Sequence, residues 1–120
     1  VARIIQNQIS LVSEYKSASH QFRSSGQFNP DELAYIGSVY NNLVMASLNN
    51  LTDLTTVLTA GSLRMSDAER MAAIDRIDRD VTNQLTFLRF FNNRTAVLGL
   101  QRAKEQENID ELQKMYNVLP

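Results

Sequence analysis

The sequence predicts an all-α protein: an antiparallel helical bundle of three main helices plus a short C-terminal helix. Glycine and proline are few, four and two in 120 residues, and Gly26, Pro30 and Gly61 fall between apolar-periodic segments. Those segments place apolar residues at steps of three and four, and helix-capping patterns precede three of them. By contrast, no segment shows the period-two alternation typical of a half-buried strand.

The first predicted helix ends at Ser24-Ser25-Gly26, because glycine is common just past a helix C-terminus. Its apolar residues lie on one helical face, as expected for a helix that packs against neighbours. This face carries Ile4, Leu11, Tyr15, Ala18 and Phe22.

The second predicted helix starts at Asn29-Pro30-Asp31-Glu32. Asn29 fits the N-cap, Pro30 the first helical position and Glu32 the third position of a capping box. We expect the helix to end near Ala60-Gly61. Its stripe is Leu33, Ile36, Tyr40, Leu43, Leu51, Leu54 and Leu58.

The third predicted helix starts with a second capping box, Ser66-Asp67-Ala68-Glu69, and its pattern continues to about residue 107. A helix of that length would measure roughly 60 Å at 1.5 Å per residue, more than the second helix can cover. A further cap pattern, Asn108-Ile109-Asp110-Glu111, predicts the short final helix.

The stretch FLRFFNNRT (87–95) lies where the partner helix should end. The stripe of the third helix would next meet Asn92, Thr95 and Gly99, which are poor core residues. We therefore expect Phe87, Leu88 and Phe91 to be largely buried and residues 92–94 to lie at a bend or helix end. Such a bend would bury Leu98 and Leu100 against the bundle end. The alternative is a straight projecting helix whose apolar end needs a partner.

Composition limits the possible functions. At 120 residues the chain has the size of one domain, and we expect 1–120 to be a single helical-bundle domain. The net charge of −1 argues against a dedicated nucleic-acid binder, and no apolar run is long enough to span a membrane.

Chemistry-bearing residues are scarce. Cysteine is absent, and the single histidine, His20, has no carboxylate at metal-ligand spacing. Phosphate-binding glycine loops and nucleophile motifs are also missing. The sequence therefore predicts a protein that is not an enzyme, with no cofactor, no metal and no small-molecule substrate.

A candidate contact surface lies on the second helix, which is depleted in charge. From Leu33 to Leu63 the only charged residue is Asp53, and Asn42, Asn49 and Asn50 contribute neutral polar groups. Depletion of charge marks the core of protein interfaces, so these residues are candidates for assembly with another protein. The alternative is a central helix that contacts both neighbours, and the apolar width of the helix favours it.

Residues 81–104 contain no acidic residue, and basic residues lie among their phenylalanines. Arg89 and Arg94 therefore join the candidate contact surface. Basic residues beside aromatics can hold single-stranded nucleic acid. A solvated basic strip is favoured, because the aromatics fall mostly on the proposed core face.

Four stretches of the chain carry a family resemblance. RMSDAER (64–70), IDRI (74–77) and FLRFFNNRTAVLGLQRAKEQENIDELQKMYNV (87–118) resemble the C-terminal region of small exported Tra proteins encoded in conjugative transposons of Bacteroides-type bacteria. QFNPDELAYIGSVYNNL (27–43) is similar to the middle region of the same family. The resemblance covers most of the chain and rests on the pattern as a whole.

The resemblance implies a non-enzymatic component of a conjugative transfer apparatus, of the type IV secretion kind, with other transfer proteins as its partners. It also implies a periplasmic or cell-envelope location. The chain starts with Val1, and we expect it to be a trimmed piece of a longer exported chain whose signal peptide lies upstream. The alternative function is that of a cytoplasmic helical adaptor or regulatory protein. The family assigns no catalytic residues, and the oligomeric state is left open.

Overall fold

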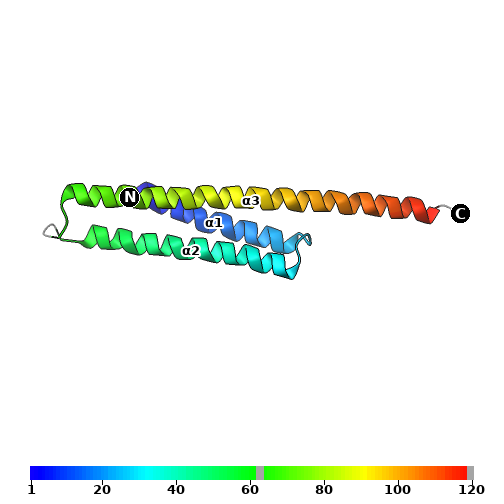
Figure 1. Cartoon of the computed structure of the whole chain (residues 1–120), viewed down its shortest axis with the longest axis horizontal. Coiled ribbons are helices and arrows are strands. Elements are labelled where there is room, and N and C mark those ends of the chain that lie inside the picture. Colours follow the sequence, from blue (N-terminus) through cyan, green and yellow to red (C-terminus); the bar gives the residue numbers. More distant parts are fainter. Residues whose placement is uncertain (62–63, 119–120) are drawn as a thin grey trace.

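The protein consists of three long helices in a computed structural model that describes residues 1–61 and 64–118 (Figure 1). They are α1 (Ala2–Ser24), α2 (Pro30–Thr59) and α3 (Asp67–Val118). The helices form a rod of 87 × 19 × 15 Å. The prediction of an all-α protein with three main helices is confirmed.

Local hydrogen bonds set the helix ends where the sequence predicts them. The Asn29 side chain accepts from the Glu32 amide at 2.8 Å, and the Glu32 carboxylate accepts from the Asn29 amide at 3.0 Å. Ser66 and Glu69 form the same reciprocal pair at the start of α3, with lengths of 3.1 and 3.4 Å. Gly26, at φ +73°, takes the left-handed conformation just past α1.

Contacts between helices show how the chain runs. α1 and α3 point the same way, since Arg3 pairs with Asp78 and Glu14 pairs with Arg89. α2 runs in the opposite direction to α1 and α3 (Figure 1). Accordingly, Asn50 on α2 bonds to Asp80 on α3, and the earlier Tyr40 bonds to the later Asn92.

The core consists of two apolar clusters along the rod. One lies toward the loop between α1 and α2, and the other toward the loop between α2 and α3. Burying a large apolar side chain contributes about 1.5–3 kcal/mol, so these residues supply the main stabilisation. The first cluster contains Leu11, Ala18, Phe22, Ile36, Tyr40, Leu85 and Leu88, and the second contains Ile4, Leu54, Val57, Ile77 and Val81.

Polar side chains separate the two clusters. Gln8 of α1 donates from Nε2 to the Ser47 carbonyl oxygen at 2.9 Å, and Asn50 accepts from Gln84 Nε2 at 2.6 Å. Asn50 also donates to Asp80 at 3.4 Å. Buried polar groups are tolerated only with such partners, so this layer specifies how the three helices align.

The predicted bend near residue 93 and the separate C-terminal helix are both wrong, because α3 is one helix from Asp67 to Val118. Asn92 does occupy the core stripe, but it accepts a 2.6 Å hydrogen bond from the Tyr40 hydroxyl. Thr95 donates its hydroxyl to the Phe91 carbonyl oxygen at 2.8 Å. At Gly99, an added Cβ would lie 3.3 Å from Cζ of Phe28, so the missing side chain makes room for that ring.

Each of the three positions that the pattern marks as poor core positions is therefore accommodated, and the helix continues. Burial follows from this continuity. Leu88 is buried, as predicted, and Phe91 is partly buried. The prediction for Phe87 is wrong, since 47% of it is exposed. Leu98 and Leu100 are also exposed, contrary to the bend hypothesis.

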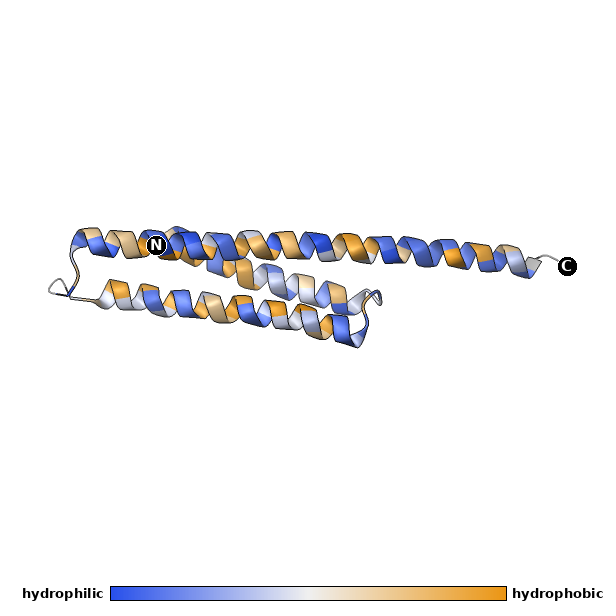
Figure 2. Ribbon diagram, viewed as in Figure 1, coloured by the Kyte–Doolittle hydropathy of each residue, from blue (hydrophilic) through white to orange (hydrophobic). Residues whose placement is uncertain are grey.

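The end of α3 projects beyond the other two helices (Figure 1). α2 begins beside Arg102, which bonds to Glu32 in its first turn. From Lys104 onward, α3 extends past the loop that joins α1 and α2, and apolar and polar residues alternate along it (Figure 2). We call residues 104–118 the projecting segment.

Candidate protein-contact site

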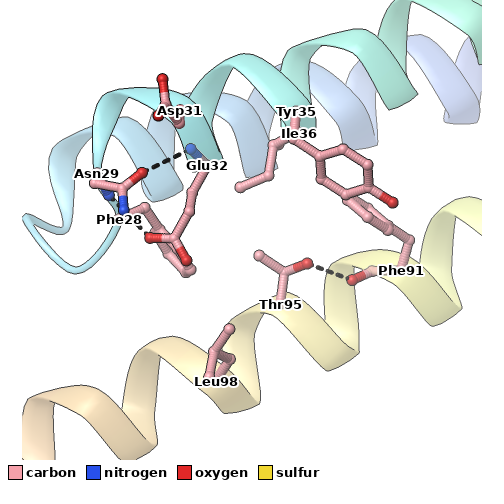
Figure 3. A pocket seen from close by; sticks show the side chains of 9 residues that line it. All are labelled: Phe28, Asn29, Asp31, Glu32, Tyr35, Ile36, Phe91, Thr95 and Leu98. Carbon is pink, nitrogen blue, oxygen red and sulfur yellow. Dashed lines mark hydrogen bonds between the residues drawn. The ribbon is translucent and has the colours of Figure 1, made fainter.

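A groove lies between the first turns of α2 and the middle of α3 (Figure 3). It encloses a cavity of about 350 Å³ with mainly apolar walls. A second hollow, on the outer side of α3, shares Phe91, Thr95 and Leu98 with it. We call the two together the aromatic groove. Its aromatic and aliphatic residues are Phe28, Tyr35, Ile36, Phe87, Phe90, Phe91, Val97 and Leu98.

Phe91 connects the aromatic side chains of the groove. Its ring packs edge-on against Tyr40 at 5.9 Å between centroids and stacks with Phe87 at 6.2 Å. It also approaches Tyr35 at 6.3 Å. Tyr35 and Phe90 are 63% and 59% exposed, so the outer part of the groove is an open apolar surface.

An ion pair holds the end of the groove together. Both terminal nitrogens of Arg102 donate to the Glu32 carboxylate at 2.8 Å, and one also donates to the Gln27 carbonyl oxygen at 3.0 Å. The guanidinium lies 5.7 Å from the Phe28 ring centroid. A bidentate pair of this kind has a defined geometry, and it fixes the first turn of α2 against α3.

The same contacts lower the pKa of Glu32 to about 2. The hydrogen bond from Arg102 is the main cause, and the backbone amide of Asn29 adds to it. Tyr40, deeper between the helices, shows the opposite effect, because burial raises its pKa to about 12. Its neutral hydroxyl therefore remains available to donate to Asn92 throughout the physiological pH range.

The candidate residues from the sequence do not form one surface. Asn42, Asn49 and Asp53 are exposed on α2. Asn50 is buried in the polar layer and bonds to α3, so its assignment to a contact surface is wrong. Arg89 pairs with Glu14 of α1 at 2.8 Å.

Arg94 is the one candidate that lies in the aromatic groove, with its guanidinium 5.6 Å from the Phe90 ring centroid. Sequence reasoning missed Phe28, Tyr35 and Phe90 as site residues. A usable signal exists: Tyr35 precedes the core residue Ile36, and Phe90 precedes Phe91, so each helix carries an aromatic beside its stripe. Extra apolar width of this kind indicates a second contact face.

The walls of the groove are mainly apolar, with a few polar side chains among them. Its polar lining comprises Asn29, Asp31 and Glu32 at the start of α2 and Arg94, Thr95 and Gln101 of α3. Asn29 and Glu32 form the capping box, Glu32 is paired with Arg102, and the Arg94 guanidinium lies over the Phe90 ring. Among residues 1–61 and 64–118, no three side chains of the metal-ligating types gather into a cluster. Within the same residues, none of the helices has the length and apolar character needed to cross a bilayer.

Comparison with protein-family models, with curated proteins and with solved structures finds no match to this chain. Fold and site together define a three-helix protein with an open aromatic groove.

The ion pair of Glu32 predicts a stability loss in acid. Its folded pKa of about 2 lies below the ordinary 4.5, so its contribution is complete above about pH 4.5 and disappears as the pH falls toward 2. Glu32→Gln keeps a capping side chain but loses the charge. We expect its melting temperature to be below that of the wild type at pH 7, and the difference to close between pH 4.5 and 2. Thermal unfolding followed by circular dichroism measures both; a constant difference across this range would contradict the assignment.

Proposed function

We propose that the protein is a non-enzymatic component of a conjugative transfer apparatus of the type IV secretion kind, and that it acts through contacts with other transfer proteins in the periplasm or cell envelope. The aromatic groove is the observation that carries the proposal. An open surface with several exposed aromatics is costly in water and marks sites where proteins associate.

The residues of the groove coincide with the resemblance to exported Tra proteins. Its α2 side comes from 27–43 and its α3 side from 87–118, which are two of the stretches that carry the resemblance. The groove is thus formed by stretches that carry the resemblance, which supports the proposal. The rod shape also suits a protein that contacts partners along its length.

The alternative, a cytoplasmic adaptor that uses its basic strip, has less support. Two of the four basic residues in 81–104 are engaged within the chain, Arg89 with Glu14 and Arg102 with Glu32. A phosphate partner would have to compete with these carboxylates. A signal peptide encoded upstream would favour the envelope, and a translation start directly before Val1 would favour the adaptor.

A transfer assay tests the proposal. In donor cells that carry the gene, we expect deletion to lower transfer frequency and the wild-type gene to restore it. Phe90→Glu, which places a charge in the groove, should fail to restore transfer. Met71→Glu is the matched control, since Met71 is similarly exposed (64%) but lies at the start of α3, far from the groove. Normal transfer in the deletion strain would overturn the proposal.

A further inference from the structure

The projecting segment carries an apolar face with no neighbour in the chain. Ile109, Leu112 and Tyr116 are exposed along it and line one shallow hollow. An exposed apolar stripe on a helix that projects from the bundle indicates a surface where another molecule binds.

This stripe lies on the same side of α3 as the aromatic groove. Ile109, Leu112 and Tyr116 follow Phe91, Arg94 and Leu98 by 18 residues each, which is five turns at 3.6 residues per turn. Because α3 is unbroken, the apolar stripe of the projecting segment and the aromatic groove face the same side of one helix. A single straight partner can therefore contact both.

The two regions also match in length and in charge. The groove side of α3 (87–101) and the projecting segment (104–118) each span about 21 Å at 1.5 Å per residue. Residues 81–104 have four basic residues and no acid, whereas 105–118 contain Glu105, Glu107, Asp110 and Glu111 against the single Lys114. Arg89 and Arg102 are paired with Glu14 and Glu32 of their own chain. The charge match across an antiparallel pair therefore rests on Arg94, which lies in the groove and would meet the acidic segment of the other copy.

We propose that two copies of the chain associate through antiparallel α3 helices, with the projecting segment of each copy seated in the aromatic groove of the other. The two-fold axis then lies near residues 101 and 102. Leu112 of one copy comes to Phe91 of the other, and Tyr116 to Phe87. Each three-helix bundle gains the partner's segment as a fourth helix, and both apolar patches are covered at once.

A parallel pair is disfavoured. It would place the acidic residues of both projecting segments side by side, with like charges opposed. Only the antiparallel arrangement uses the length match and brings Asp110 and Glu111 to the level of Arg94.

The mass of the purified chain in solution tests the proposal. Light scattering after size exclusion should give twice the chain mass of 13.6 kDa at micromolar concentration. Leu112→Glu should raise the dissociation constant of the dimer at least about tenfold, as for an interface centre. Leu100→Glu is the matched control, because Leu100 is equally exposed (71% against 64%) but lies on the opposite side of α3, and it should leave the dimer intact.

Cysteine pairing tests the orientation, since the chain has no cysteine of its own. Gln101→Cys, near the proposed axis, should cross-link to itself under mild oxidation. Tyr116→Cys should not cross-link to itself but should cross-link to Phe87→Cys when the two are mixed. Self-cross-linking of Tyr116→Cys would indicate a parallel pair and overturn the proposal.

A monomeric wild type, or a dimer unaffected by Leu112→Glu, would also overturn it. The inference rests on the proposed function, because it uses the same groove and assigns a second copy of the chain as a partner of that groove. These measurements use the purified chain alone, so a negative result leaves the transfer proposal standing, and a normal deletion strain leaves the dimer standing.

Discussion

Replacement of Leu88 by alanine is expected to lower the free energy of unfolding by about 3 kcal/mol, within the 2–5 kcal/mol usual for buried leucines. Leu88 is fully buried in the cluster that joins α3 to α1 and α2, so truncation leaves a cavity between three helices. Urea denaturation followed by circular dichroism measures the loss.

Leu100→Ala is the control, because Leu100 is exposed on the same helix and should change stability by less than about 0.5 kcal/mol. Phe91→Ala should cost less than Leu88→Ala, since Phe91 is only partly buried and its ring borders the open groove. If Phe91→Ala costs more than Leu88→Ala, the groove is not open in solution.

Replacement of Asn92 by alanine is expected to lower the free energy of unfolding by about 1–2 kcal/mol. It leaves the hydroxyl of the buried Tyr40 without its acceptor, and an unsatisfied buried donor costs about 1–3 kcal/mol. The higher helix propensity of alanine offsets roughly 0.6 kcal/mol of this. Chemical denaturation of Asn92→Ala, Tyr40→Phe and the double variant forms a cycle that isolates the pair.

The double variant should be less destabilised than the two single variants added together, because it removes donor and acceptor at once. Asn93→Ala is the matched control one residue later, at an exposed position, and should be neutral or slightly stabilising. Additive effects in the cycle would show that the Tyr40–Asn92 bond does not form, and would reopen the possibility of a bend at this point.

The groove and the projecting segment have one cause, the continuity of α3. A bend near residue 93 would have turned Leu98 and Leu100 onto the bundle end and closed the region. Instead, the helix carries its aromatic and aliphatic residues out along a straight line, past the first turn of α2. The surface proposed to bind a second copy therefore exists because Asn92, Thr95 and Gly99 are each accommodated without breaking the helix.

The candidate site was predicted only in part. Arg94 was singled out from its position among phenylalanines, and it does lie in the groove. Asn50 was singled out from charge depletion, but it bonds inward to α3, whereas Asn42, Asn49 and Asp53 of the same helix are exposed. Phe28 could not be selected, because its role depends on which part of α3 lies opposite the start of α2.

The sequence by itself determined the three main helices and the starts of α2 and α3. Asn29 with Glu32, and Ser66 with Glu69, act between residues three apart, so their effect is contained in the local pattern. The stripes that bury Leu11, Leu54 and Val81 are equally visible, because helical periodicity depends only on spacing.

Only the tertiary structure decided where α3 ends and what its middle does. An asparagine in a core stripe looks like a break until its partner is known, and that partner, Tyr40, lies 52 residues away in sequence. Likewise, Gly99 looks like a weak point until the Phe28 ring fills the space beside it. Spacing along a chain cannot reveal such pairs, because they form only when two helices pack at one particular register.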